Sequence, residues 1–342
     1  MKRCFYFRLL FMICIHQFSW AQQKPHYTQY LQNQYVINPA LSGIENYLDI
    51  RLSHRQQWVG VQDAPMTSYF SAHAALNKSD YRTTATSFKI PDDNPRGHDY
   101  WERYTAASPH HGIGMQVIND VTGPLRFFSA YATYAFHVGI TSKTNLAAGF
   151  GAGINKVSLN TAKLNFGTLN PIDPVIDNSG VLNSYKPDFM AGLYLYSADY
   201  FVGLSAQQIL SQPLEFSDNI VRTINGKTVP HLFMTAGYRF FLSEDLNLTP
   251  SLMVKKVMPS PIQYDLNVKL QYWDRAWIAA SYRWKEGYAA MMGFNVSGKF
   301  NLGYSYDISY TKLSTISKGT HELIIGFLLF NDYGDWYQKR IW

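Results

Sequence analysis

The amino-acid sequence predicts an all-β protein: a transmembrane antiparallel β-barrel of about 14 strands, preceded by an irregular N-terminal segment. Three observations predict this fold, namely a leader-like N-terminus, many segments in which polar and apolar side chains alternate, and an unusual composition. Of the 342 residues, 25 are Tyr, and charged residues make up only 16%, whereas average globular proteins contain about 25% charged residues. This composition favours an outer-membrane barrel over a secreted β-sandwich.

The first 21 residues have the features of a secretory signal peptide. Lys2, Arg3 and Arg8 precede or flank an apolar stretch at 9–15, and Ser19-Trp20-Ala21 provides a cleavage site between small residues. The alternative is a retained membrane anchor. A membrane-spanning helix needs ~20 apolar residues, and this stretch is too short for one.

The predicted leader contains both cysteines, Cys4 and Cys14. The mature chain would therefore contain none, which excludes disulfides, thiolate nucleophiles and cysteine-based metal sites. Cleavage also removes three basic residues, so that 30 basic and 24 acidic residues become 27 and 24. This near-neutral balance gives no support to nucleic-acid binding, which requires clustered Lys and Arg.

The stretch from 261 to 310 alternates most regularly. Tyr264, Leu266 and Val268 fall on one face of a predicted strand, while Asp265 and Lys269 fall on the other. In a membrane barrel the apolar face contacts lipid and the polar face lines the lumen, whereas a soluble sandwich buries its apolar face. Alternation alone does not separate these two folds. Strand length, strand count and the leader favour the barrel.

Fourteen segments are predicted as strands, and an even number is typical of single-chain bacterial barrels. They are 47–58, 66–76, 112–119, 125–138, 145–155, 188–196, 200–209, 231–241, 246–257, four strands within 261–310, and 321–330. The predicted organisation is a signal peptide at 1–21, a plug-like irregular segment at 22–43, a barrel at 44–330 and a tail at 331–342.

Short connections alternate with longer ones, such as 157–185 and 211–230. Short periplasmic turns and long external loops are typical of outer-membrane barrels. The exception is 77–109, either a periplasmic insert or a slip of one strand in the count. In the strand at 145–155, Gly149, Gly151 and Gly153 share one face, which predicts close approach of another backbone, such as a lumen-filling segment.

Candidate catalytic and metal-binding groups are few. Ser71 and His73 share a strand face, but residues so spaced lie ~6–7 Å apart along a strand, and no acid stands beside them. We therefore favour an interpretation as ordinary lumen residues over a hydrolase site. His110 and His111 are adjacent, so their side chains point to opposite faces and make a poor chelate. We predict no catalytic residue, no metal ligand and no cofactor.

Several motifs, in their order and spacing along nearly the whole mature chain, resemble those of one protein family. They include Tyr27-Thr28-Gln29-Tyr30 with Asn38-Pro39-Ala40, Arg55-Gln56-Gln57-Trp58-Val59-Gly60, Asn119-Asp120 with Gly123-Pro124, Gly303-Tyr304-Ser305-Tyr306-Asp307, and Gly319-Thr320-His321-Glu322. Together they resemble the PorP/SprF family of type IX secretion-system outer-membrane proteins.

The resemblance implies a non-enzymatic protein in the outer membrane of a Gram-negative, Bacteroidetes-type bacterium. The implied partners are components of the type IX machinery, outer-membrane lipid, and a secreted surface protein recognised through its C-terminal domain. Roles at the cell surface and in gliding motility are implied in the same way. The sequence departs from the family pattern at 77–109 and in the tail, which leaves the last strand and Trp342 as alternative barrel-assembly signals.

Eleven residues are candidates for partner binding. They are Arg55, Gln57, Trp58 and Gly60 at a predicted strand end, Asn38 and Pro39 in the N-terminal segment, and the polar-face charges Arg51, Asp265, Lys269, Arg283 and Asp307. The charges fit either a salt-bridge network that braces the lumen, which we favour, or a docking groove. The paired Trp and Arg are typical of an interface hot spot, although a turn-shaping role is equally compatible with them.

Three other functions remain open at this point. The main alternative is a porin or small-solute channel, which requires an open lumen. An outer-membrane enzyme and a purely structural barrel are the others.

Overall fold

The structure, a computed structural model, describes most of the predicted barrel. The described residues are 27–78, 105–164, 180–215, 222–243, 245–273 and 275–331. The predicted signal peptide, all of the tail except Asn331, and the middle of the 77–109 insert therefore lie outside them. Over the described residues, no helix is both long and apolar enough to cross a membrane.

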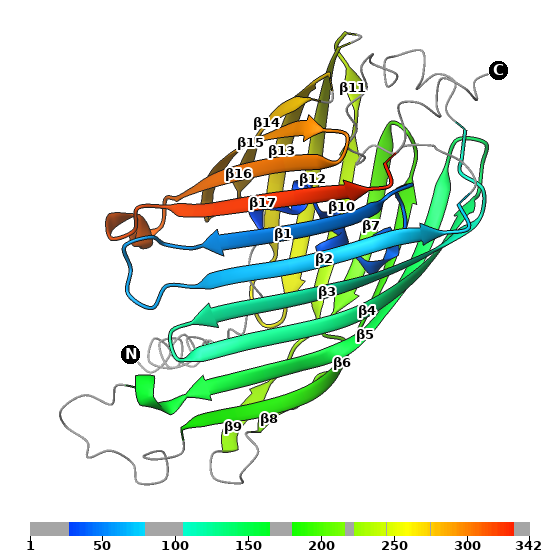
Figure 1. Ribbon diagram of the computed structural model, residues 1–342. Coiled ribbons are helices and arrows are strands. Elements are labelled where there is room, and N and C mark those ends of the chain that lie inside the picture. The colour runs from blue at the N-terminus through cyan, green and yellow to red at the C-terminus, as the bar shows by residue number, and fades with distance from the viewer. Residues whose placement is uncertain are drawn as a thin grey trace, which may run out of the picture.

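The strands form one closed antiparallel sheet (Figure 1). They are β1 Leu48–Gln56, β2 Met66–Leu76, β3 His110–Thr122, β4 Leu125–Gly139, β5 Asn145–Asn160, β6 Val181–Tyr196, β7 Tyr200–Gln207, β10 His231–Tyr238, β11 Phe240–Phe241, β12 Leu246–Val257, β13 Gln263–Tyr272, β14 Ala276–Arg283, β15 Gly287–Ser297, β16 Phe300–Ser309 and β17 Thr320–Leu329. The sheet closes because β1 pairs with β17 as well as β2, and β10 pairs with both β7 and β12. Since β11 continues β10 beyond Arg239, the barrel has the fourteen strands predicted from the sequence.

The barrel has apolar side chains outside and polar side chains inside. Along β13, Leu266 and Val268 are 53% and 46% exposed, whereas Asp265 and Asn267 are 1% and 3% exposed. The same alternation repeats along the neighbouring strands β14 to β16. This arrangement confirms the prediction that the apolar faces lie toward lipid and the polar faces toward the lumen.

One side of the wall is taller than the rest. Strands β3 to β6 have 13 to 16 residues, whereas β7, β10 and β14 have eight. The predicted limits of the loop 157–185 are wrong at both ends. Residues 157–160 pair with residues 181–184, and this pairing lengthens β5 and β6. The ends of β5 and β6 are set by the hydrogen bonds between these two strands. The alternation of side chains within one segment does not show how far such pairing extends.

The barrel has two ends, which we call the mouth and the base. The mouth carries the connections 57–65, 123–124, 284–286 and 310–319, together with the hairpin of β8 Pro213–Glu215 and β9 Arg222–Lys227. The base carries the short turns 140–144, 197–199, 273–275 and 298–299, and both ends of the 77–109 insert. Most of the longer connections thus lie at the mouth and the short turns predominate at the base, as the sequence predicts, with the 77–109 insert at the base as the predicted exception and 123–124 and 284–286 as short turns at the mouth.

Residues 27–47, which we call the lumen segment, run inside the barrel from mouth to base. They form three short 3₁₀ helices, η1 Thr28–Leu31, η2 Gln34–Val36 and η3 Pro39–Leu41, drawn in dark blue inside the barrel in Figure 1. The first contacts β16 and β17, and the third contacts β4, β5 and β6. Nearly all residues of the segment are buried.

The glycine face of β5 has two explanations. A Cβ at Gly149 would overlap the backbone of Pro39 and Ala40, so the predicted close approach of a lumen-filling segment is confirmed at this position. Gly151 and Gly153 instead lie close to groups of the wall itself: Gly151 to the Met190 side chain, and Gly153 to the Ala130 carbonyl and the Tyr131 ring.

Candidate functional site at the barrel mouth

Four charged side chains from four strands meet inside the lumen near the mouth. Arg55 on β1 contacts Asp307 on β16 through Nη2 and Oδ2 at 2.6 Å, and Glu322 on β17 through Nη1 and Oε2 at 3.0 Å. Arg283 at the end of β14 contacts the same Asp307 oxygen at 2.9 Å. All four are at least nine-tenths buried. Period-two alternation turns each of them inward, and the β1–β17 register places Arg55 opposite Glu322.

This charge cluster holds the mouth end of the lumen segment through Thr28. The Thr28 hydroxyl accepts hydrogen bonds from Arg55 Nη1 at 2.6 Å and from Arg283 Nη2, and it donates to Asp307 Oδ2 at 2.6 Å. The Thr28 amide donates to Glu322 Oε2 at 2.8 Å. Hydrogen bonds to ionised groups are about twice as strong as neutral ones, so the cluster acts both as a brace of the barrel and as an anchor.

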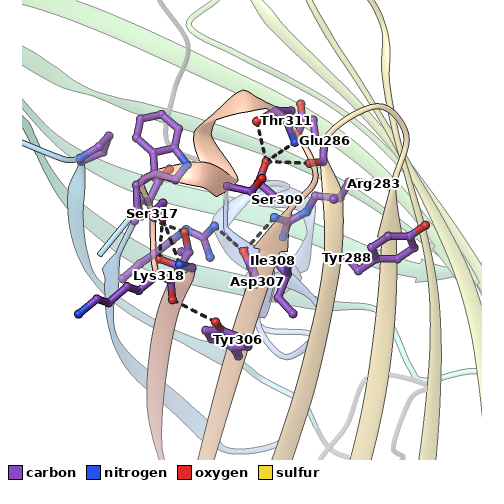
Figure 2. Close-up of a pocket in the computed structure, with 18 of the residues that line it drawn as sticks. Arg283, Glu286, Tyr288, Tyr306, Asp307, Ile308, Ser309, Thr311, Ser317 and Lys318 are labelled. Carbon is purple, nitrogen blue, oxygen red and sulfur yellow. Dashed lines mark hydrogen bonds and ion pairs between the residues drawn. The ribbon is translucent and has the colours of Figure 1, made fainter. Parts of the chain in front are cut away.

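A pocket of about 620 Å³ lies above this cluster. It is lined by residues of the β1–β2 turn, the ends of β3, β14 and β16, and the β16–β17 loop, among them Arg55, Gln57, Trp58, Asp120, Arg283, Glu286, Asp307, Ser309, Ser314 and Lys318. Figure 2 shows Arg283 and Asp307 joined within the pocket, whereas the Tyr288 ring points away from it.

The rim of the pocket is fixed by backbone hydrogen bonds between two loops. Val59 N donates to Gly319 O at 2.9 Å, and Lys318 N donates to Val59 O at 2.8 Å. Trp58 N donates to the Thr320 hydroxyl at 3.1 Å. Trp58 has a φ of 46°, a left-handed conformation that is unfavourable for a bulky residue. Such strain, held by surrounding contacts, is common at ligand-binding sites.

Five of the eleven predicted site residues line this pocket, namely Arg55, Gln57, Trp58, Arg283 and Asp307. Two more lie next to it. Asp265 is behind Arg283, with 3.6 Å between Oδ2 and Nε, and Gly60 lies near the side chain of Lys318.

The remaining four predicted residues lie deeper in the lumen, away from the pocket. Arg51 pairs with Asp49 at 2.7 Å, and the ammonium of Lys269 lies 5.5 Å from the centre of the Trp277 ring. Asn38 caps η3, accepting from Ala40 N at 3.0 Å and donating to Leu193 O at 3.0 Å, and Pro39 is the first residue of that helix.

Ser71, His73, His110 and His137 contact the lumen segment, whereas His111 is exposed and bonded to the Tyr134 hydroxyl. Ser71 Oγ accepts from Asn33 Nδ2 at 2.8 Å, and His73 Nδ1 accepts from Gly43 N at 3.3 Å. Each member of the pair thus binds a different part of the segment. His110 and His137 stack with 4.5 Å between ring centres. Among the residues in the described ranges, no group of three or more His, Cys, Asp or Glu is arranged to hold a metal ion.

Three residues of the site were not among the eleven predicted candidates: Thr28, Asp120 and Glu322. Each falls within a motif noted above, and Asp120 and Glu322 fall on inward-facing positions of their strands. A carboxylate at an inward-facing strand position was the sequence feature that could have identified Asp120 and Glu322. The partner of each carboxylate depends on strand register, which single segments do not reveal.

The family model of the type IX secretion system membrane protein PorP/SprF matches residues 19–327. A search of curated proteins finds no match.

Solved structures of similar fold are outer-membrane proteins. The Ralstonia pickettii toluene transporter TbuX has 10% identity and a TM-score of 0.44, with 86% of this chain and 92% of that chain covered. Omp33 of Acinetobacter baumannii has 6% identity and a TM-score of 0.45, with 84% and 100% covered. The translocator domain of the autotransporter NalP from Neisseria meningitidis has 12% identity and a TM-score of 0.40, with 82% and 87% covered.

The family assignment rests on the match over most of the chain, since structural likenesses at these identities and TM-scores carry no functional argument. A closed barrel with an apolar exterior agrees with that match. The chain is an outer-membrane β-barrel and belongs to the PorP/SprF family of type IX secretion system membrane proteins.

Proposed function

We propose that this barrel is a non-enzymatic docking platform, which binds a cognate exported protein through the C-terminal domain of that protein. The mouth faces the outside of the cell, since external loops are the longer ones in bacterial barrels. The observation that carries the proposal is the pocket of about 620 Å³ at the mouth, set above a lumen that the chain fills with its own N-terminal segment.

The filled lumen favours a platform over a channel. Wall side chains satisfy the backbone of the lumen segment along its length: Gln116 Nε2 donates to Tyr35 O at 2.6 Å, and Ser205 Oγ donates to Ile37 O at 2.6 Å. Buried backbone carbonyls need such partners. Opening a solute pathway would require many of these bonds to break together.

The docking surface has the composition of an interface hot spot. Trp58 and Arg55 line one pocket, and binding energy at interfaces concentrates on a few such residues in partly desolvated pockets. The two loops that form the rim are hydrogen-bonded to each other. This preorganisation lowers the entropy cost of binding a partner.

A pull-down tests the proposal. The tagged protein is extracted from native outer membranes in mild detergent, and the proteins that accompany it are identified by mass spectrometry. We expect one large exported protein, which is released when its C-terminal domain is truncated. Recovery of the barrel alone, even after gentle crosslinking, would contradict the proposal.

The chain offers a matched control for this experiment. Trp58 at the mouth and Trp273 at the base both lie in turns between strands with left-handed φ angles of 46° and 50°. We expect Trp58→Ala to reduce the recovered partner and Trp273→Ala to leave it unchanged. Stepwise conductance in planar bilayers would instead favour a porin, and we expect the protein to be silent there.

A further inference from the structure

We infer that the mouth pocket accepts a basic side chain, lysine or arginine, of the docking polypeptide, with Asp120 as its counter-ion. The inference rests on the proposed function, because it specifies the chemistry of the partner at the same site. It starts from one buried carboxylate that the charge cluster leaves without a cation.

Asp120 lies near the mouth end of β3, lines the pocket and is only 6% exposed. Its carboxylate accepts hydrogen bonds from two neutral hydroxyls, those of Thr67 and, at 3.4 Å, Thr122. Across the described parts of the chain it forms no ion pair. A buried charge is costly unless it is paired, so this position favours a cation from outside the chain.

The cations of the pocket are committed elsewhere or lie in solvent. Arg55 is bound to Asp307 and Glu322, and Arg283 to Asp307. In the strand register Thr67 lies between Arg55 and Asp120, which separates their backbones by about 9–10 Å. Lys318 is exposed, and its ammonium makes no ion pair within the described residues.

The other groups of the pocket suit a cation better than an anion. Of the buried charged residues that line it, Arg55, Arg283 and Asp307 are joined in ion pairs, so among the described residues Asp120 is the buried charge left to attract a charged ligand. Ser309 and Ser314 add neutral polar groups, and Trp58 adds an aromatic surface of the kind on which guanidinium groups stack. A volume of about 620 Å³ accommodates a side chain together with part of its backbone.

Charged thiol reagents test directly whether the pocket prefers a cation to an anion. The only cysteines, Cys4 and Cys14, lie in the predicted leader, so a cysteine introduced by Ser314→Cys is unique in the mature protein. Ser314 lines the pocket and is exposed. The readout is the rate of labelling by a trimethylammonium-ethyl methanethiosulfonate relative to its sulfonate analogue, each normalised to the rate with free 2-mercaptoethanol.

We expect the cationic reagent to be favoured about tenfold at low salt, since the Asp120 carboxylate attracts a cation and repels the sulfonate, whereas the buried guanidinium groups of the pocket are already bound to carboxylates. Adding Asp120→Asn should remove most of this preference, and Asp120→Glu should retain it. A cysteine from Ser142→Cys in an exposed base turn should show none. Equal normalised rates at Ser314→Cys, or no effect of Asp120→Asn in a folded barrel, would overturn the inference.

A protection experiment then uses a peptide probe. Acetyl-Gly-Arg-Gly-amide should slow labelling of the Ser314→Cys protein, whereas the same peptide with citrulline, which has nearly the same shape without the charge, should not. The folded state of each variant is checked by the heat-dependent mobility of the barrel on gels. Equal protection by both peptides would contradict a role for the positive charge.

The two proposals fail in distinguishable ways. A cation-selective pocket on a barrel that captures no exported protein would contradict the docking function and leave the pocket chemistry intact. Capture of an exported protein that is unaffected by Asp120→Asn would contradict the counter-ion role of Asp120 and leave the docking function intact.

Discussion

The two ends of the lumen segment are held by different chemistry. At the mouth, Thr28 is bound by a cluster of ionised side chains, and a pocket lies directly above it. At the base, the backbone of Ser42 and Gly43 is held by two stacked imidazole rings: His137 Nε2 lies 2.8 Å from Ser42 O, and His110 Nε2 lies 3.2 Å from Gly43 O.

The packing differs in the same way. At the base, Gly112 on β3 touches the backbone of Ser42 and Gly43, so no space remains between wall and segment. At the mouth, long charged side chains span the gap between the wall and Thr28. The base therefore fixes the segment by shape, while the mouth fixes it by charge and leaves room for a ligand. Four substitutions test this contrast.

Removing one charge at the mouth should have the largest effect. Among the described residues, Arg55→Met leaves Asp307 with one guanidinium partner and Glu322 with none, and breaking a buried ion pair costs about 3–5 kcal/mol. We expect this loss in the free energy of unfolding, measured by denaturant titration in lipid vesicles. Hydrogen exchange at the Thr28 amide should accelerate. Arg126→Met, at an exposed position, is the control, and an equal effect of both would contradict the anchoring role.

Adding a side chain where the wall touches the lumen segment at the base should have the second-largest effect on stability. The side chain of Gly112→Val would overlap the Ser42 carbonyl, and overpacking a close-packed site costs up to about 3 kcal/mol. We expect a lower unfolding midpoint and faster hydrogen exchange at Gly43. The matched control is Ile113→Val at the next position, which is 45% exposed on the outer face. If both variants unfold at the same denaturant concentration, the base is not closed by shape.

Removing a single hydroxyl at the mouth should have a smaller effect. Thr28→Val keeps the shape of the side chain but leaves two guanidinium donors and Asp307 without that partner. We expect a loss of about 1–2 kcal/mol in stability, measured in the same titration. Thr28→Ser, which keeps the hydroxyl, should stay close to the parent. A valine variant as stable as the serine variant would show that the mouth anchor does not depend on this hydroxyl.

The smallest effect on stability is expected at the pocket rim. Trp58→Ala removes a partly exposed side chain but keeps the backbone bonds of Trp58 and Val59. We expect a change in unfolding free energy within about 0.5 kcal/mol, as for most surface substitutions, together with weaker partner capture. A large loss of stability would assign Trp58 to turn shaping rather than docking.

Much of the fold followed from local patterns. Period-two alternation identified β2 and β12 at their observed limits, Met66–Leu76 and Leu246–Val257. It failed at 157–160 and 181–187, where the strands extend above the general level of the wall. Strand ends there are set by pairing between β5 and β6, and such pairing is a property of two segments rather than one.

The candidate site was predicted only in part, for a related reason. Arg55, Arg283 and Asp307 were recognised as inward-facing charges, and the structure unites them. Lys269 shared the same pattern, yet it lies over Trp277 and away from the cluster. Alternation specifies the face on which a side chain lies. The height of that side chain in the barrel and its neighbours across the lumen depend on the register of all fourteen strands.

The sequence by itself determined the inside and outside of this protein, because the side-chain period of a strand is fixed by backbone geometry. It also determined the family, through motifs whose order spans the chain. Only the tertiary structure decided that the N-terminal segment is anchored at Thr28 by the lumen charges, and that Asp120 forms no ion pair with any described residue. Those outcomes depend on which residues meet when the sheet closes, and closure joins β1 to β17, segments about 270 residues apart in the chain.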